Sequence, residues 1–194
     1  MAYTPDKHHR RSIRLQGYDY SSEGLYFITL VCQNRAELFG EVRSGTVQLN
    51  AFGKIALEEW YHTARVRDNL EVHESVVMPN HLHGILEITQ KKGENEVGAF
   101  RSPSHTIGAI IRGYKVATIN KIKELIKESL GGNTESNGEL LFAPTVEKIL
   151  SLDYKIWQRN YYEHIIRNEQ SYYRISEYIK NNPAKWEEDK LKIR

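Results

Sequence analysis

The chain of 194 residues has a single cysteine, Cys32, which excludes an internal disulfide bond. Cys32 follows the apolar run 25–31, and one buried thiol is typical of a protein in a reducing compartment. No apolar run approaches the roughly 20 residues that a membrane span needs. The first residues are polar and charged, without the apolar segment of a secretion signal. The sequence therefore predicts a cytoplasmic protein without a membrane partner.

Net charge is also small, because 27 Lys and Arg against 25 Asp and Glu leave +2. The total alone therefore does not indicate a nucleic-acid partner. Two stretches, 7–14 and 101–123, are nonetheless basic and free of acidic residues. Such stretches can face phosphates while carboxylates elsewhere keep the total near zero. An ordinary solvated surface explains the same charges equally well.

Apolar periodicity predicts one α+β domain over residues 1–194, an antiparallel sheet with helices packed on one face. A basic arm at 1–20 precedes the first strand, and about 90–144 form a loop–helix–loop excursion. Asn50 and Asn168 are candidate caps for two helices. Strands are expected at 25–33, 72–78, 82–88 and 161–166, a hairpin at 38–49, and helices after Asn50, over about 104–128, and after Asn168.

His81 and His83 flank one apolar residue at the start of the strand predicted at 82–88. Side chains at alternate positions of a strand share a face. The two imidazoles therefore converge, while Leu82 points to the opposite, buried face. Two imidazoles make half of a metal site, and surface or core histidines are the simpler interpretation of the spacing alone.

The last predicted helix carries Tyr178 and Asn182, which are four residues apart and so neighbours on one face. An amide oxygen beside a phenol would complete the site, and a His, His, Asn set with open positions suits a divalent ion. Imidazoles favour zinc, cobalt or manganese over magnesium, so ligand type leaves the metal open. By spacing alone, Tyr178 could instead pack in the core, and Asn182 could be a helix cap before Pro183.

Three blocks of sequence occur together and in a fixed order. They are Met-Pro-Asn-His-Leu-His at 78–83, Trp-Gln-Arg-Asn-Tyr-Tyr-Glu-His-Ile-Ile-Arg-Asn at 157–168 and Tyr-Ile-Lys-Asn-Asn-Pro at 178–183. Together they resemble the HUH single-strand endonucleases. Within these the chain is most similar to the small insertion-sequence type of tyrosine transposase, and especially to the REP-associated tyrosine transposases. The resemblance runs from about residue 26 to residue 186.

The resemblance implies a ferredoxin-like fold and an enzyme of DNA transposition and recombination. Such an enzyme cleaves and rejoins single-stranded DNA near a hairpin through a 5′-phosphotyrosine. Carried onto this chain, Tyr178 on the C-terminal helix is the nucleophile, and His81, His83 and Asn182 bind a divalent ion, magnesium or manganese. The partner is single-stranded DNA with a hairpin, and a homodimer and a monomer both stay open. Three basic residues are the expected DNA contacts: Arg14, Arg112 and Lys115.

Other functions and residues stay open at this point. One alternative is a non-catalytic protein that binds nucleic-acid hairpins on the same scaffold. Another is a metal-dependent phosphoesterase acting through water, which would leave Tyr178 idle. Glu87 and His164 are alternative ligands, and Tyr173 is an alternative nucleophile.

Overall fold

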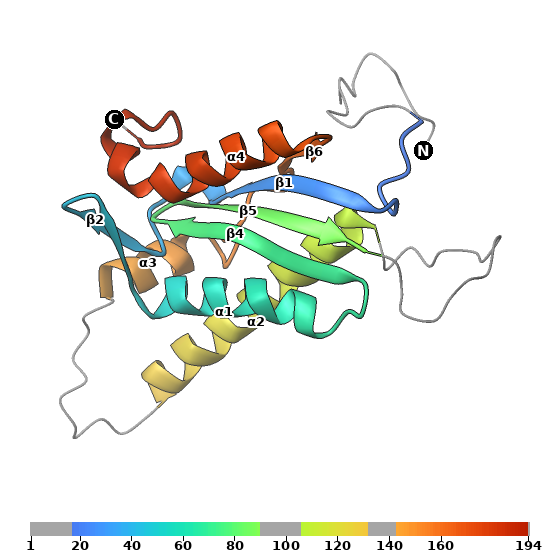
Figure 1. Ribbon diagram of the computed structural model, residues 1–194. Helices are drawn as coiled ribbons and strands as arrows, with labels where there is room; N and C mark the ends of the chain where they lie inside the picture. The colour runs from blue at the N-terminus through green and yellow to red at the C-terminus, as the bar shows by residue number, and fades with distance from the viewer. Residues whose placement is uncertain (1–16, 90–105, 132–142, 194) are drawn as a thin grey trace, which may run out of the picture.

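The computed structural model describes residues 17–89, 106–131 and 143–193. A four-stranded sheet forms its centre, with strand order β4-β5-β1-β6 and every neighbouring pair antiparallel (Figure 1). The strands are β1 (Gly24–Val31), β4 (Leu70–Met78), β5 (His81–Ile88) and β6 (Tyr162–Ile166). A helix precedes β4, and a long helix follows β5 before β6, so the strands of this sheet and these two helices have the β-α-β-β-α-β order of a ferredoxin-like fold. The predicted antiparallel α+β sheet is therefore confirmed.

Three helices cover the sheet: α1 (Ala51–Arg65), α2 (Ile107–Gly131) and α4 (Glu169–Asn181). Figure 1 shows α1 and α2 below the sheet and α4 above it. The expectation that helices pack on one face is therefore wrong, and the reason lies in β1 and β5. Tyr26 and Ile28 pack in the larger core with α1 and α2, whereas Phe27 and Ile85 pack against Ile179 of α4. Both faces of these strands are apolar, so both are buried.

The predicted helix caps and hairpin are confirmed. The Asn50 side chain accepts a hydrogen bond from Gly53 N at 2.9 Å, and that of Asn168 accepts one from Ser171 N at 2.8 Å. The hairpin pairs β2 (Gly40–Arg43) with β3 (Thr46–Leu49). Its two-residue link, Ser44-Gly45, has φ values of 51° and 73°, as the tight turns of hairpins require.

The segments after α2 and α4 differ most from the sequence prediction. A further helix, α3 (Ala143–Ser151), begins at the end of the predicted 90–144 excursion. After α4, the 3-10 helix η4 (Pro183–Glu188) turns the chain back over the α4 face of the sheet. No helix within the described ranges is long and apolar enough to cross a membrane.

Gly84, directly after the second histidine, is required by close packing on the other face of β5. A Cβ atom at this position would lie 2.5 Å from Cζ2 of Trp60, whose side chain is fully buried. Because Trp60 cannot retreat without opening the core, the added methyl group must displace the strand that carries His83.

We expect Gly84→Ala to lower the free energy of unfolding by about 1–3 kcal/mol, as overpacking of a core does. Thermal unfolding would show this as a drop of about 2–4 °C for each kcal/mol. Gly113→Ala in α2 is the matched control. Its Cβ would meet only the end of the Arg67 side chain at 3.3 Å, and alanine favours a helix. Equal stability of the Gly84→Ala variant and the unsubstituted protein would contradict the packing argument.

Candidate active site and metal centre

The histidine pair, His81 and His83, lies on β5 and faces α4. The ring centroids are 4.5 Å apart, and the residues are 0% and 3% exposed. Leu82, between them, packs in the core on the opposite face. The predicted convergence of the two imidazoles is therefore confirmed.

Asn80 fixes the tautomer of His81. The Asn80 amide nitrogen donates to the carbonyl oxygens of Arg35, at 3.1 Å, and Leu191, at 2.8 Å. Its Oδ1 therefore accepts the proton of His81 Nδ1, at 2.8 Å. This leaves a lone pair on His81 Nε2, which is buried without a hydrogen-bond partner among the described residues. A free lone pair on an imidazole oriented in this way is the arrangement of a metal ligand.

His83 lies between a threonine and the tyrosine predicted as the nucleophile. Thr29 Oγ1 is 2.8 Å from Nδ1, and the Tyr178 hydroxyl is 3.2 Å from Nε2. When Nδ1 donates to Thr29, Nε2 accepts from the phenol. Phe27 meets the edge of the Tyr178 ring at 6.2 Å between centroids and 88° between planes. The helix and the strand thus hold the phenol beside the histidine pair.

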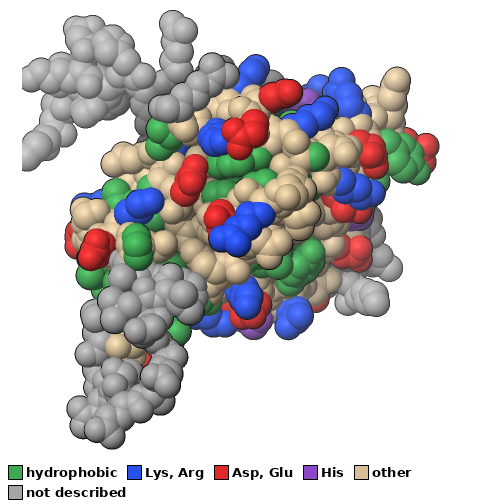
Figure 2. Space-filling model, turned by 90° about the vertical axis from the view of Figure 1, so that its left-hand side faces the viewer, with side chains coloured by type: hydrophobic (Ala, Val, Ile, Leu, Met, Phe, Trp, Pro, Cys, Tyr) green, Lys and Arg blue, Asp and Glu red, His purple; other side chains and the backbone are tan. Residues whose placement is uncertain are grey.

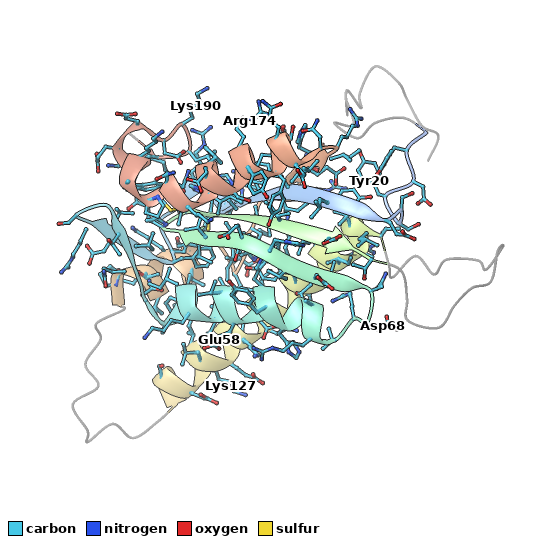
Figure 3. All side chains as sticks on the ribbon, viewed as in Figure 1. Tyr20, Glu58, Asp68, Lys127, Arg174 and Lys190 are labelled. Carbon is cyan, nitrogen blue, oxygen red and sulfur yellow. The ribbon has the colours of Figure 1, made fainter. Side chains whose placement is uncertain are left out.

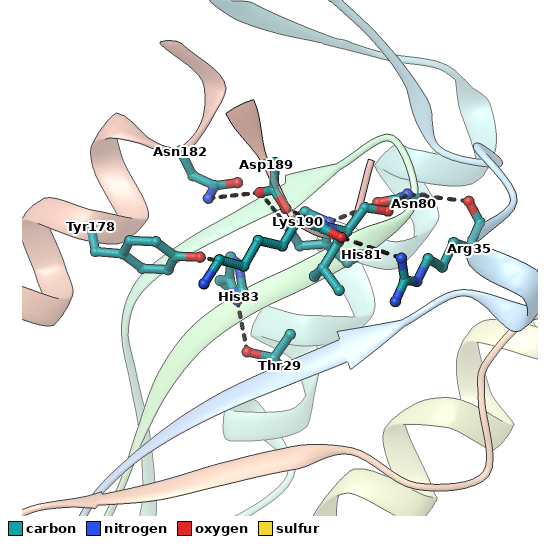
Figure 4. Close-up of polar contacts among 10 residues, drawn as sticks. Thr29, Arg35, Asn80, His81, His83, Tyr178, Asn182, Asp189 and Lys190 are labelled. Atoms are coloured by element: carbon teal, nitrogen blue, oxygen red, sulfur yellow. Dashed lines mark hydrogen bonds and ion pairs between the residues drawn. The ribbon is translucent and has the colours of Figure 1, made fainter. Parts of the chain in front are cut away.

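Asn182 and Asp189 face the histidine pair from the end of α4 and from the segment after η4 (Figure 4). Asn182 Nδ2 donates to Asp189 Oδ2 at 3.3 Å, and Asn182 Oδ1 is buried without a partner in the described structure. Asp189 Oδ2 is 3.9 Å from His81 Nε2. The ligand atoms of His81, His83 and Asp189 all lie within 4.8 Å of one another. Two imidazole nitrogens and nearby amide and carboxylate oxygens fit a divalent ion.

Burial keeps both imidazoles neutral. It lowers the pKa of His81 to about 4, although the Asp189 carboxylate acts in the opposite direction. Burial, together with the repulsion that a protonated His81 would exert, holds the pKa of His83 well below its ordinary value. Burial and the Asp189 carboxylate raise the pKa of Tyr178. At neutral pH the imidazoles are therefore ready to bind a cation, whereas the phenol keeps its proton unless a cation or base assists.

We expect the metal-free protein to lose stability as the pH falls from 7 to 5. The pKa of His81 lies below its unfolded value, so the unfolded chain binds more protons and acid favours it. The loss begins near the ordinary histidine pKa of 6.5 and continues to about 4. By pH 5, His81 alone should lower the free energy of unfolding by about 2 kcal/mol. Urea unfolding in EDTA at each pH measures the slope, which His81→Gln should flatten; an unchanged slope in that variant would contradict the assignment.

A cavity of about 760 Å³ opens beside the histidine pair and Tyr178. Tyr162 of β6, which is 52% exposed, and the basic residues Arg174 and Lys190 also line it. Figure 3 shows both basic residues on the α4 side of the sheet. On the face shown in Figure 2, basic and acidic side chains are interspersed, without one large basic patch. The carboxylates of Glu177, Glu188 and Asp189 also line the cavity, so its basic residues are interspersed with acidic ones as well.

The three predicted DNA contacts do not join this cavity. Arg112 and Lys115 lie on α2, on the other side of the sheet, and Arg14 lies outside the described residues. Lys115 Nζ donates to the carbonyl oxygen of Gln158 at 2.7 Å and to those of the next two residues at 3.4 and 3.3 Å. Burial lowers the pKa of Lys115 to about 8. Lys115 thus anchors the loop before β6, and DNA contact by these three residues stays a prediction.

The alternative residues are placed apart from the histidine pair. Glu87 belongs to a different cluster, in which it contacts His73. His164 is exposed on the edge strand β6, and Tyr173 is 62% exposed. Of the residues that sequence reasoning missed, Asn80 stands next to His81 in the first motif. Thr29 and Asp189 carry no comparable sequence signal.

Comparison with known proteins bears on the family and the fold of the chain. No protein-family model matches the chain. A protein of Haemophilus influenzae, described only as uncharacterized, is 39% identical over 200 residues, which cover 98% of the chain and 97% of that protein. The chain belongs to one family with this protein. A solved structure of a REP-associated tyrosine transposase bound to a REP hairpin covers 90% of the chain and 74% of its own, with 19% identity and a TM-score of 0.51.

The chain has the fold of the REP-associated tyrosine transposases. The resemblance carried by the three sequence motifs is therefore confirmed at the level of the fold. A protein of Deinococcus radiodurans, described as a candidate transposase, matches with 15% identity and a TM-score of 0.45 over 88% of the chain and 97% of its own.

Proposed function

We propose that this protein is a transposase that cleaves and rejoins single-stranded DNA next to a hairpin, with Tyr178 as nucleophile and a divalent ion as cofactor. One observation carries the proposal: the Tyr178 hydroxyl lies 3.2 Å from Nε2 of His83, in a site whose neighbouring ligand atoms fit a cation. The hairpin bound by the REP-associated neighbour supports the class of substrate.

The proposed step exchanges one phosphodiester for another. The Tyr178 oxygen bonds to the scissile phosphorus, and the bond from phosphorus to the 3′ oxygen breaks. The products are a 5′-phosphotyrosine and a 3′-hydroxyl. The net proton transfer is therefore from the phenol to the leaving 3′ oxygen. Because bond energy is kept in the covalent intermediate, the same hydroxyl or another can reverse the step without ATP.

Each residue has a distinct part in this proposal. Asn80 and Thr29 fix the imidazole orientations of His81 and His83, so that Nε2 of each faces the reacting side. These imidazoles, with Asn182 or Asp189, would hold the ion. When bound, a divalent ion would polarise the scissile phosphate and neutralise the charge that develops on it.

The cavity beside Tyr178 offers a place for the strand that is cut. Arg174 and Lys190 supply positive charge for backbone phosphates, and Tyr162 offers a half-exposed ring on which a base can stack. Arg174 and Lys190 lie on the α4 side of the sheet (Figure 3), and Tyr162 lines the same cavity as Tyr178. Arg112 and Lys115 lie on α2, on the other side of the sheet. We therefore propose them as the nearer DNA contacts.

The test is incubation with single-stranded DNA that contains a hairpin, in manganese and separately in magnesium. We expect a covalent adduct on denaturing gels and a nucleotide linked to Tyr178 in mass spectra of the digested protein. An adduct on Tyr173 would overturn the choice of nucleophile. Cleaved DNA without any adduct would indicate attack by water, and hairpin binding without cleavage would indicate the non-catalytic function.

A further inference from the structure

A second cluster of ligand side chains lies on the α4 face of the sheet, away from the histidine pair. It consists of Glu71 and His73 on β4 and Glu87 on β5, and is called the His73 cluster below. One ligand atom from each residue lies within 4.8 Å of the others. His73 Nε2 is 2.7 Å from Glu87 Oε2. All three side chains are reached by solvent, because Glu71 is exposed and the His73 and Glu87 side chains are 25% and 33% exposed.

A β-bulge aims His73 at this position. Val72 pairs with Leu86 and Ser75 with Gly84, so two residues of β4 lie opposite Ile85 alone. Those two residues, His73 and Glu74, both contact α4. His73 Nδ1 is 3.2 Å from the Tyr172 hydroxyl, and Glu74 forms an ion pair with Lys180 at 3.4 Å. Bulges of this kind commonly re-aim a side chain for a function.

The charges of the cluster are unbalanced. Glu71 and Glu87 are directly paired across the β4–β5 ladder, and like charges in this position destabilise a sheet. Within the described part of the chain, neither carboxylate forms an ion pair with a lysine or arginine. The Lys180 ammonium nearby is paired with Glu74 and Glu177 instead. Among the described residues, two carboxylates are thus gathered around one imidazole, His73, without a lysine or arginine paired to either of them.

We propose that the His73 cluster is a second divalent-cation site, separate from the proposed catalytic one, which takes a zinc-like ion. One imidazole and two carboxylates leave an open position for water, a ligand set that zinc accepts. The ion replaces the proton between His73 Nε2 and Glu87. The imidazole proton then lies on Nδ1 and is donated to Tyr172, whose hydroxyl can accept as readily as it donates.

This site connects the central sheet to the helix that carries Tyr178. Tyr172 lies earlier on α4 than Tyr178, and its hydroxyl contact with His73 joins that helix to β4. An ion in the His73 cluster would fix the imidazole and, through it, the position of α4 on the sheet. The inference does not rest on DNA cleavage, because metal binding and stability report on it directly.

The test compares zinc binding by the unsubstituted chain and its variants after removal of metal with EDTA. Bound zinc per chain is measured by elemental analysis across a range of free Zn²⁺. Glu87→Gln and His73→Gln should each bind about one zinc ion fewer than the unsubstituted protein. Glu74→Gln is the matched control, because it removes a charge from the same bulge but no ligand. The difference between variants is the readout, since histidines elsewhere in the chain can also bind zinc.

Thermal stability gives an independent check, because the effect of Glu71→Gln on the melting temperature should have opposite signs in EDTA and in zinc. In EDTA, Glu71→Gln should raise the melting temperature, because it removes the repulsion between paired carboxylates. In zinc, it should lower the melting temperature relative to the unsubstituted protein, because a ligand is lost. Tyr172→Phe should keep the zinc count and weaken the affinity about tenfold. An unchanged zinc count in Glu87→Gln and His73→Gln, or the same effect of Glu71→Gln with and without zinc, would overturn the proposal.

Discussion

Tyr178→Phe should abolish DNA cleavage and the covalent adduct, with a loss on the order of 10³-fold or more, as expected when a nucleophile is removed. The change deletes only the hydroxyl that lies 3.2 Å from His83 Nε2. Phenylalanine keeps the ring that packs edge-on against Phe27. Hairpin binding, measured by fluorescence anisotropy, should therefore change less than twofold or so, since phosphate contacts set most of the affinity.

Tyr173→Phe is the matched control for this prediction. Tyr173 is the neighbouring alternative on α4, is 62% exposed, and also loses one phenolic hydroxyl in the substitution. It should retain full cleavage. If the Tyr178→Phe variant still forms an adduct, the assignment of the nucleophile is wrong, whatever the effect on DNA binding.

Removal of divalent metal should stop cleavage by the unsubstituted protein, and manganese should restore it. His81→Gln should lose at least about 100-fold in activity under the same conditions, because its Nε2 is the buried lone pair without a partner. Metal binding should also stabilise the unsubstituted protein and raise its melting temperature. At a free metal concentration 100 times the dissociation constant, the free energy of unfolding should rise by about 2.7 kcal/mol. His81→Gln should show a much smaller increase.

His164→Gln provides the control for loss of an imidazole, because this histidine is exposed on the edge strand. Its activity and its stabilisation by manganese should match those of the unsubstituted protein. Cleavage that persists in EDTA would contradict metal dependence. A manganese response unchanged in His81→Gln would place the ion elsewhere, and the His73 cluster would then be the first position to test.

Local patterns were sufficient to predict much of this fold and half of the site. Alternation placed His81 and His83 on one face, because a strand allows only two directions for a side chain. Helical spacing placed Tyr178 and Asn182 on one face of α4. The asparagine caps were predictable because they depend on neighbouring backbone groups.

Features that depend on distant segments could not be predicted in the same way. Asp189 reaches His81 only because η4 reverses the chain after Pro183. The His73 cluster depends on a bulge, and a one-residue slip in a ladder changes which side chains face each other. The sequence predicts Lys115 as a DNA contact, and it gives no sign that this side chain also binds three carbonyl oxygens of a distant loop.

The Lys115 anchor changes how a DNA-binding defect should be interpreted. Lys115 holds the loop that leads into β6, and the Tyr162 ring of β6 forms part of the cavity wall on the opposite side of the sheet. A shift of that loop would therefore alter the shape of the cavity from a distance. Weaker DNA binding by a Lys115 variant could therefore come from a displaced cavity wall or from a lost phosphate contact. The salt dependence of binding distinguishes the two, because only the loss of a phosphate contact reduces it.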